Sequence, residues 1–355
     1  MLSRDRLPPP ILSDLALTAL APMQDVTDLA FMKAIALYGS PDYFFTEYFR
    51  VYASSRLEKH ILRSITENTT GRPIFAQLIG ESIPDLVRSV KELSHYAIAG
   101  IDLNMGCPAP RIYRKNVGGG LLRDPDRIDQ ILGELRANIP GLFTVKMRIG
   151  FEDTENFDRI LRLIDYHQID LLSLHGRTVK QMYRGAVHYD RIAHAVQQVK
   201  CPVLANGNVS SASTAANILA TTGAVGVMIG RAAIRNPWIF QQIRQQLSGQ
   251  QVAVVTLAEV RDYINRLHNM VAAKTVQERS RVNSMKKYLN FIGESVDASG
   301  AFLRDTRLAR TEMELFEICD RYLLSDPNAG FALEPYPGLV ARPSCETACE
   351  WWQVN

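Results

Sequence analysis

Several features that would place this chain of 355 residues in a specialised class are missing from it. No stretch approaches the roughly twenty apolar residues of a membrane helix, and residues 1–14 carry charges and prolines where a signal peptide has an apolar core. Cysteine is scarce, and its five residues are widely spaced, which argues against a disulfide framework. No G-x-G-x-x-G motif follows the first apolar run, which weakens a dinucleotide-binding fold. We therefore expect a cytoplasmic protein with reduced thiols.

The cysteine spacing gives little support for a metal centre, and the net charge gives little support for a highly charged binding partner. Cys345 and Cys349 are the only close cysteine pair, and no histidine or second pair lies near enough in the sequence to complete a tetrahedral zinc site. We expect no metal. The net charge of +3 neither demands nor excludes a nucleic acid, so the distribution of charge has to decide.

Short apolar runs alternate with amphipathic segments of helical length between residues 17 and 230. The apolar runs are Leu17–Met23, Tyr43–Thr46, Ile74–Leu78, Ile101–Asn104, Phe143–Met147, Leu171–His175, Val203–Asn206 and Val225–Ile229. The helical patterns include Ser82–Ala97, Pro125–Ala137, Glu155–His167, Tyr189–Val199 and Ser211–Thr221. Buried strands separated by helices indicate a parallel sheet, and eight such units match a (β/α)₈ barrel better than the alternative, an open doubly wound sheet.

The predicted strands end in polar residues, which a barrel brings together on one face, where active sites lie. Solvated loops explain residues such as Glu47 or Arg148 taken singly. They do not explain Gln77 and Lys146, which lie inside strand patterns and need buried partners. The sequence therefore predicts a site at the C-terminal face of a barrel that spans residues 17–240, after an extension of residues 1–16.

Beyond the barrel the pattern predicts helices only, over Thr256–Ala273, Val276–Ile292 and Glu312–Leu324. We expect a helical domain over 241–325 and a tail over 326–355. Residues 261–310 hold ten Lys or Arg against five Asp or Glu, a net charge of +5. The basic cluster of this segment comprises Arg279, Arg281, Lys286 and Lys287. From charge alone, a solvated helix face is as good an explanation as an RNA-binding one.

The polar residues at the strand ends suit a flavin. Lys146 can stabilise the negative charge that reduction builds on the pyrimidine side of the ring, and the amide of Gln77 can pair with that edge. The segments 206–208 and 230–231 follow the last two strands, where barrels commonly bind phosphate. His175 could bind the cofactor or the substrate, although a structural role explains it almost as well.

Cys107 follows a strand and stands between Gly106 and Pro108. Lone cysteines are most often small buried apolar residues, and Cys201 and Cys319 keep that interpretation. The position of Cys107 favours a chemical role, and a thiol of ordinary pKa is protonated at neutral pH, so it can act as an acid.

Six motifs carry a resemblance to a known family. They are Leu-Ala-Pro-Met-Gln-Asp-Val-Thr-Asp at 20–28, Leu-Asn-Met-Gly-Cys-Pro at 103–108, Val-Lys-Met-Arg at 145–148, His-Gly-Arg-Thr at 175–178, Ala-Asn-Gly at 205–207 and Ile-Gly-Arg-Ala at 229–232. Together they resemble the tRNA-dihydrouridine synthases over nearly the whole chain to about residue 325. The resemblance implies a barrel that binds FMN, which NADPH reduces, and a helical domain that grips folded tRNA as the substrate. A monomer is the simplest expectation for a protein that binds so large an RNA.

The resemblance also implies roles for individual residues. Cys107 would protonate C5 of a flipped-out uridine while hydride reaches C6. Residues that would contact the cofactor are Pro22, Met23, Gln24, Gln77, Lys146, His175, Asn206, Gly207, Asn208, Gly230 and Arg231. Residues that would contact the substrate are Asn104, Arg111, Arg114, Lys115 and Arg177, with Tyr113 and Arg184 close by and Arg281 and Lys286 in the helical domain. Gln24 and Asn208 depart from the residues that are common in the family.

Two other functions remain open at this point. A related barrel flavoenzyme could reduce a free small molecule, as a dihydroorotate dehydrogenase or an ene-reductase does, although the basic helical domain would then lack a task. A barrel without catalytic activity could simply bind RNA, although Lys146 and Cys107 would then have no purpose.

Overall fold

The computed structural model describes residues 6–272, 277–297 and 299–332. The described residues form two compact units, one within residues 6–32 and 40–230 and the other within residues 33–39 and 231–332. The boundary lies ten residues before the predicted one at 240, because α9 (Arg231–Arg235) and α10 (Ile239–Leu247) group with the helices that follow. Residues 33–39 join the second unit, where the ring of Tyr38 lies 4.6 Å from that of Trp238 and 5.4 Å from that of Tyr263, measured between centroids.

The first unit is the predicted eight-stranded barrel. Its strands are β1 (Leu17–Leu20), β2 (Tyr43–Phe45), β4 (Ile74–Ile79), β5 (Gly100–Met105), β6 (Leu142–Arg148), β7 (Leu171–His175), β8 (Val203–Asn206) and β9 (Gly226–Ile229). Each pairs in parallel with its neighbours in the order β2-β1-β9-β8-β7-β6-β5-β4, and β4 pairs back to β2 through Phe44 and Ile74. That last pairing closes the sheet, so the barrel is confirmed and the open doubly wound alternative is excluded.

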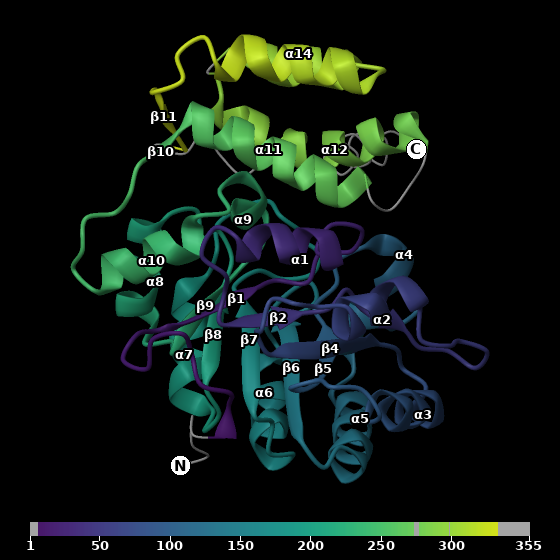
Figure 1. The fold of residues 1–355 in the computed structure, drawn as a ribbon. Coiled ribbons are helices and arrows are strands. Elements are labelled where there is room, and N and C mark those ends of the chain that lie inside the picture. Colours follow the sequence, from purple (N-terminus) through teal and green to yellow (C-terminus); the bar gives the residue numbers. More distant parts are fainter. Residues whose placement is uncertain (1–5, 273–276, 298, 333–355) are drawn as a thin grey trace, which may run out of the picture. The chain divides into compact units, whose positions relative to one another are not determined.

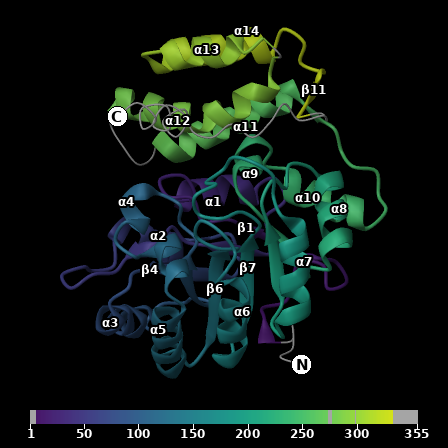
Figure 2. The same ribbon diagram turned by 180° about the vertical axis from the view of Figure 1, so that it is seen from behind.

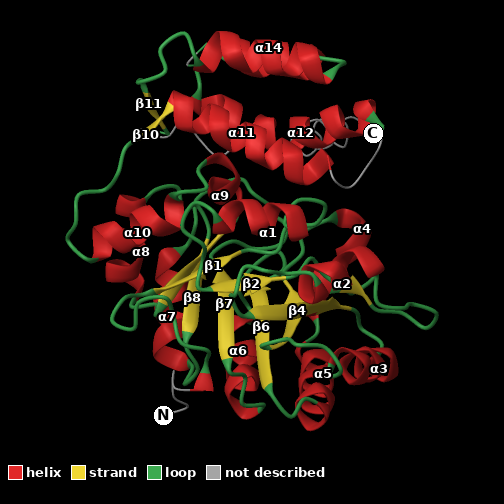
Figure 3. Cartoon of the chain, in the orientation of Figure 1, coloured by secondary structure: helices red, strands yellow, loops and turns green. Residues whose placement is uncertain are grey.

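Helices connect and cover the strands of the barrel (Figures 1 and 3). They are α1 (Leu29–Ala36), α2 (Lys59–Thr66), α3 (Ile83–Leu93), the short α4 (Pro110–Tyr113), α5 (Pro125–Asn138), α6 (Phe157–Tyr166), α7 (Tyr189–Gln198) and α8 (Ala212–Thr222), with a 3₁₀ helix over Gly118–Arg123. A two-residue strand, β3 (Phe49–Arg50), pairs with the last part of β4. Local sequence sets the helix ends: the Asp124 side chain caps α5 by accepting from Arg127 N at 3.0 Å, and Gly223 ends α8 at a φ of 68°.

The interior of the barrel changes from apolar to polar along the strands. A buried apolar cluster takes alternate residues from seven strands and contains, among others, Phe75, Leu142, Leu171 and Leu204. Side chains of a strand alternate between the two faces, so the next interior positions on these strands, toward their C-terminal ends, are Gln77 on β4, Thr144 and Lys146 on β6, Ser173 and His175 on β7, and Asn206 on β8. The polar end of the barrel is therefore the end at which catalytic sites of this fold lie.

The second unit consists mainly of α11 (Leu257–Ala272), α12 (Glu278–Ile292), α13 (Ala301–Leu308) and α14 (Glu312–Leu323), which Figure 2 shows from behind. The prediction of helices only, followed by a tail from residue 326, was wrong in one respect: β10 (Val255–Thr256) pairs antiparallel with β11 (Gly330–Phe331). This pairing joins segments that lie far apart in the sequence, which no local pattern could indicate. Helix α13 was also missed, because its eight residues bury only Phe302 and Thr306. In the described part of the chain no helix has the length and apolar character needed to cross a membrane.

Candidate active site

A row of hydrogen-bonded polar side chains crosses three adjacent strands near the C-terminal end of the barrel. The register pairs Gln77 with Asp102 and Asp102 with Thr144. Asp102 accepts hydrogen bonds from Gln77 Nε2 at 2.7 Å and from Thr144 Oγ1 at 2.6 Å, and all three side chains are fully buried. Burial raises the pKa of Asp102 to about 6, against the opposing effect of the two hydrogen bonds and of Lys146.

The row continues from Gln77 to the loop that carries Cys107. Asn104 Nδ2 donates to Gln77 Oε1 at 2.8 Å, and Asn104 Oδ1 accepts from the backbone N–H groups of Gly106 at 3.1 Å and Cys107 at 2.9 Å. On the far side of the loop, the carbonyl of Cys107 accepts from Gly119 N at 3.2 Å. The position of the cysteine backbone is therefore fixed from both sides.

Cys107 is half-buried and carries a free thiol. Burial raises the pKa of this thiol, while the nearby positive charges of Arg148 and Lys146 act in the opposite direction. The thiol is therefore protonated at neutral pH, as a proton donor requires.

Lys146 forms a hydrogen bond and interacts electrostatically with Asp102 and Cys107. Its Nζ donates to Asn206 Oδ1 at 3.3 Å, and Asn206 is oriented for this contact because its Nδ2 donates to the carbonyl of Met228 at 2.7 Å. Burial lowers the pKa of Lys146 to about 8, and the charge of Arg148 adds to that effect, while Asp102 and Cys107 oppose it. The ammonium and the thiol, which come from different strands, thus lie within electrostatic reach of each other.

Arg148 and Glu47, whose charges a position in solvated loops could have accounted for, are instead buried and hold the site together. Arg148, 2% exposed, donates through Nε to the carbonyl of Gly106 at 3.0 Å and through Nη1 to the carbonyls of Thr178 and Met182 at 2.9 and 2.6 Å. Glu47, 3% exposed, accepts from Val26 N at 3.1 Å. Burial raises the pKa of Glu47 to about 7, and the nearby charges of Asp28 and Asp25 raise it further.

Glu47 thereby supports the loop after β1 that contains three of the predicted cofactor residues. Pro22, Met23 and Gln24 are half-buried in this loop. The turn is closed by Met23 N, which donates to Thr27 Oγ1 at 2.8 Å, and by Thr27 N, which donates to the carbonyl of Met23 at 3.0 Å.

The segments predicted to bind phosphate follow β8 and β9. Gly207 has a φ of 122° and Asn208 a φ of 48°, so the chain makes a left-handed turn directly after Asn206. A Cβ on Gly207 would lie 2.9 Å from Cδ2 of His175, which explains the glycine there. His175 ends β7 and is 6% exposed, and Gly230 follows β9 next to Met23. Arg231 is the first residue of α9 and belongs to the second unit.

Three of the predicted substrate residues are exposed on or beside α4. Arg111 lies in that helix, and Arg114 and Lys115 follow it. Tyr113 is half-buried, with its ring 5.4 Å from that of Phe151 in an edge-on contact. Arg184 is exposed in the loop after β7. These cations are accessible to a large anionic partner. We call Arg111, Arg114 and Lys115 the α4 cations.

Arg177, predicted to contact the substrate near the rim of the barrel, lies inside the protein. Arg177 is only 2% exposed, because its guanidinium is taken up inside the protein. Nε and Nη2 donate to the carbonyl of Gly185 at 3.1 and 2.8 Å, and Nη1 lies 3.3 Å from Asn208 Oδ1 and 3.4 Å from His175 Nε2. Arg177 therefore fixes the loop after β7 and the turn at Asn208.

The two substrate residues predicted in the helical unit are likewise engaged within the protein. Arg281 Nε and Nη2 donate to the two carboxylate oxygens of Glu312 at 2.6 and 2.7 Å, and Glu312 also contacts His268. Lys286 Nζ donates to the carbonyl of Arg307 at 2.8 Å and also to that of Ala309, at the C-terminal end of α13. Charge and helical spacing could not distinguish Arg281 and Lys286, which form hydrogen bonds within the protein, from neighbouring cations of α12. The RNA contact of both residues stays a prediction.

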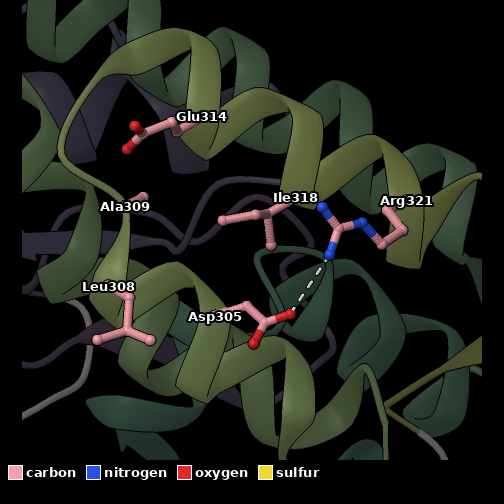
Figure 4. Close-up of a pocket in the computed structure, with 6 residues that line it drawn as sticks. All are labelled: Asp305, Leu308, Ala309, Glu314, Ile318 and Arg321. Carbon is pink, nitrogen blue, oxygen red and sulfur yellow. Dashed lines mark ion pairs between the residues drawn. The ribbon is translucent and has the colours of Figure 1, made fainter.

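A shallow cavity of about 320 Å³ lies between α13 and α14 of the helical unit. Figure 4 shows its lining residues, Asp305, Leu308, Ala309, Glu314, Ile318 and Arg321. An ion pair of 3.6 Å between Arg321 and Asp305 crosses it, and none of the predicted site residues lines it. Among the described residues no group of acidic, histidine and cysteine side chains could hold a metal ion. Cys345 and Cys349 lie outside the described residues.

The residue of this site that sequence reasoning missed is Asp102. It stands inside a short apolar run, between Ile101 and Leu103, where alternation hides a single polar position. The available signal was that Gln77 needs a buried partner on a neighbouring strand, and Asp102 is that partner.

Comparison with known proteins places the chain among enzymes of one kind. The family model described as dihydrouridine synthase matches residues 19–320. The tRNA-dihydrouridine synthase B of Vibrio vulnificus is 35% identical over 259 residues, which cover 70% of this chain and 79% of that protein. The tRNA-dihydrouridine synthase B of Vibrio cholerae is 33% identical over 293 residues, or 77% and 90% of the two chains. The tRNA-dihydrouridine(16) synthase of Neisseria meningitidis is 28% identical over 311 residues, or 85% and 93%.

A solved structure shares the fold at much lower sequence identity. The histamine dehydrogenase from Rhizobium sp. 4-9 aligns with a TM-score of 0.50 and 12% identity over 71% of this chain and 48% of that chain. At this identity the likeness concerns the fold alone.

Proposed function

Because this chain belongs to the dihydrouridine synthase family, we propose that it reduces uridine in tRNA to 5,6-dihydrouridine, with FMN as the cofactor and NADPH as the reductant. The observation that supports this most strongly is the strand register, which pairs Lys146 on β6 with Asn104 on β5, three residues before Cys107, at the polar end of the barrel. An acid for the substrate and a cation for the cofactor are the two groups that this reaction needs.

The residues present fit a flavin. Lys146 is a half-buried ammonium with one amide partner in the described part of the chain, and partial burial lowers its pKa because the surroundings stabilise the charge poorly. An anionic ring edge would supply the missing partner. We propose that Lys146 binds the ring system, that the loop 22–24 lines it, and that the turn at 206–208 with Gly230 binds the phosphate. Gln77 is fully buried and both ends of its amide are engaged, so we propose that it supports the site through Asn104. When bound and reduced by NADPH, FMN would supply the hydride for C6 of the uracil ring.

The protein's own residues complete the addition across the double bond. Cys107 gives its proton to C5 on the substrate, which becomes electron-rich as hydride arrives at C6, and the products are dihydrouridine and a thiolate. The positive charges of Arg148 and Lys146, which oppose the rise in the pKa of Cys107 caused by burial, stabilise that thiolate until it is protonated again. Asn104 holds the backbone of Cys107 in the loop that follows β5, at the same end of the barrel as Lys146.

Accessible cations on each unit can contact the tRNA backbone. In the barrel unit these are the α4 cations. In the helical unit, Arg279 and Lys287 are exposed on α12 and form no hydrogen bond or ion pair within the described ranges. They are eight residues apart, with exposed Asn283 midway, so the three lie along one side of the helix. We propose that this stripe, Arg279–Asn283–Lys287, takes the role first assigned to Arg281 and Lys286.

The test is to incubate purified protein with unmodified tRNA and NADPH and to measure dihydrouridine in the digested tRNA by mass spectrometry. We expect two hydrogens to be added per modified uridine, a yellow protein that releases FMN, and no product without NADPH. Reduction of free uracil or orotate at a comparable rate, with tRNA unchanged, would overturn the proposal. A cytoplasmic location and a monomeric state remain predictions.

A further inference from the structure

The side chains of Asp102, Gln77 and Asn104 form a chain of hydrogen bonds that has a fixed direction. An ionised carboxylate only accepts hydrogen bonds, so Gln77 must turn its NH₂ toward Asp102 and its carbonyl oxygen away from it. That oxygen then accepts from the NH₂ of Asn104, which leaves the Asn104 carbonyl oxygen to face the opposite way. There it accepts from the backbone N–H of Cys107 at 2.9 Å.

The shape of the Gln77 and Asn104 amides does not by itself determine this orientation. The two ends of a side-chain amide have nearly the same shape, so only the surrounding donors and acceptors decide which end points where. If Gln77 were reversed, the NH₂ of Asn104 would have to face two backbone N–H groups, and the loop would lose both of its bonds to Asn104. Both ends of the chain have a fixed hydrogen-bonding character: the backbone N–H groups of Gly106 and Cys107 only donate, and the Asp102 carboxylate, ionised above its pKa of about 6, only accepts. Asp102 is 0% exposed, so water cannot take its place.

We propose that Asp102 is a positioning residue: its carboxylate sets the orientation of the Gln77 and Asn104 amides and thereby holds Cys107 in the position from which it gives up its proton. The proposal rests on the function proposed above for its catalytic meaning, but the positioning itself is a property of the protein alone. Asp102 is fully buried, so it acts through Gln77 and Asn104.

The test measures the rate at which iodoacetamide alkylates Cys107 in the full-length protein, followed by mass spectrometry of the peptide that contains it. No tRNA or NADPH is present. In Asp102→Ala the chain loses its fixed end, and we expect Cys107 to react faster by about fivefold or more, as in Asn104→Ala. Asp102→Asn can still turn an acceptor oxygen toward Gln77, so it should restore a rate within about twofold of wild type.

Two further variants separate positioning from a general loosening of the core. Thr144→Val removes the other hydrogen bond of the same carboxylate and leaves the link to Gln77 in place, so its alkylation rate should stay within about twofold of wild type. The double variant Asp102→Ala with Asn104→Ala should react no faster than Asn104→Ala alone, because both substitutions break one chain. If Asp102→Ala does not fold, Gln77→Leu breaks the chain at its middle and should raise the rate as Asn104→Ala does.

An unchanged alkylation rate in Asp102→Ala, or in Gln77→Leu in its place, would overturn the proposal. So would rates that multiply in the double variant, or an Asp102→Asn protein that reacts as fast as Asp102→Ala. Failure of the proposed function looks different: Cys107 would respond to these substitutions as expected while the wild-type protein left tRNA unreduced.

Discussion

The ammonium of Lys146 donates to Asn206 Oδ1 at 3.3 Å, and this is its one hydrogen bond to the part of the chain that the structure describes. The two residues lie on β6 and β8, with β7 between them. A half-buried charge with a single hydrogen bond is costly to the protein by itself and favourable for a ligand that brings the missing negative charge.

The first prediction concerns the stability of the flavin-free protein. The pKa of Lys146 is about 8 in the folded protein, against 10.5 in the unfolded chain, so the unfolded chain binds the proton more tightly. This group therefore makes the free energy of unfolding rise as the pH increases from 8 to 10.5. Relative to Lys146→Met, wild type should gain on the order of 2 kcal/mol between about pH 7.5 and about pH 9.5 in denaturant titrations.

Lys91→Met is the matched control, because Lys91 is exposed on α3. It should leave the pH dependence of the free energy of unfolding as it is in wild type. A Lys146→Met protein whose free energy of unfolding follows wild type in parallel across this range would show that Lys146 carries no unsupported charge.

The second prediction concerns Glu47, the buried acid that supports the loop 22–24. Its pKa is about 7 in the folded protein, against 4.5 unfolded, so the folded state favours the protonated acid. Its contribution to stability is complete below pH 4.5 and is lost as the pH rises to about 7 and beyond. Glu47→Gln keeps the acceptor oxygen without the charge, so wild type should lose on the order of 3 kcal/mol relative to the variant between about pH 4.5 and about pH 8.

Thermal unfolding of both proteins across that range checks this prediction. The melting temperature of wild type should fall relative to that of Glu47→Gln as the pH increases. Two curves that keep a constant separation would mean that the folded protein does not hold Glu47 in its protonated form.

The third prediction separates the free cations of α12 from the structural one. Arg279→Ala with Lys287→Ala should weaken tRNA binding without a change in melting temperature. The slope of log K against log salt should become shallower by about one for each phosphate that the variant no longer neutralises. Arg281→Ala should instead lower the melting temperature, because it leaves Glu312 without its bidentate partner. Filter binding at several salt concentrations and thermal unfolding measure the two effects.

The reverse pattern would contradict this division of roles. If Arg281→Ala removed tRNA affinity at unchanged melting temperature, while the Arg279 and Lys287 substitutions left affinity intact, the ion pair with Glu312 would have to open in the complex.

The sequence was sufficient to predict the barrel because each strand carries its own signal. Runs such as Leu171–His175 and Val203–Asn206 are mostly apolar until their last residue, which marks both the strand and the end where the site lies. Helix boundaries were predicted to within a few residues where a cap is present, as at Asp124 before α5. Eight such units left few alternatives to a barrel.

Only those site residues could be predicted that are recognisable individually from their residue type and their position in the sequence. Cys107 and Lys146 stand out by residue type and position, whereas Asp102 depends on the register of β4, β5 and β6, which one sequence does not give. Likewise, nothing in the sequence separates Arg281 from Arg279 two residues earlier. Their difference lies in Glu312, which a fold has to bring within reach.

The most direct test of the account is single-turnover reduction of tRNA by Cys107→Ala. The protein is first reduced with NADPH in the absence of oxygen, and unmodified tRNA is then added. We predict flavin content and flavin reduction close to those of wild type and dihydrouridine formation slower by about 10²–10⁴-fold, the usual contribution of a positioned general acid. Dihydrouridine formation within a few-fold of the wild-type rate would remove Cys107 from the mechanism and contradict the central claim.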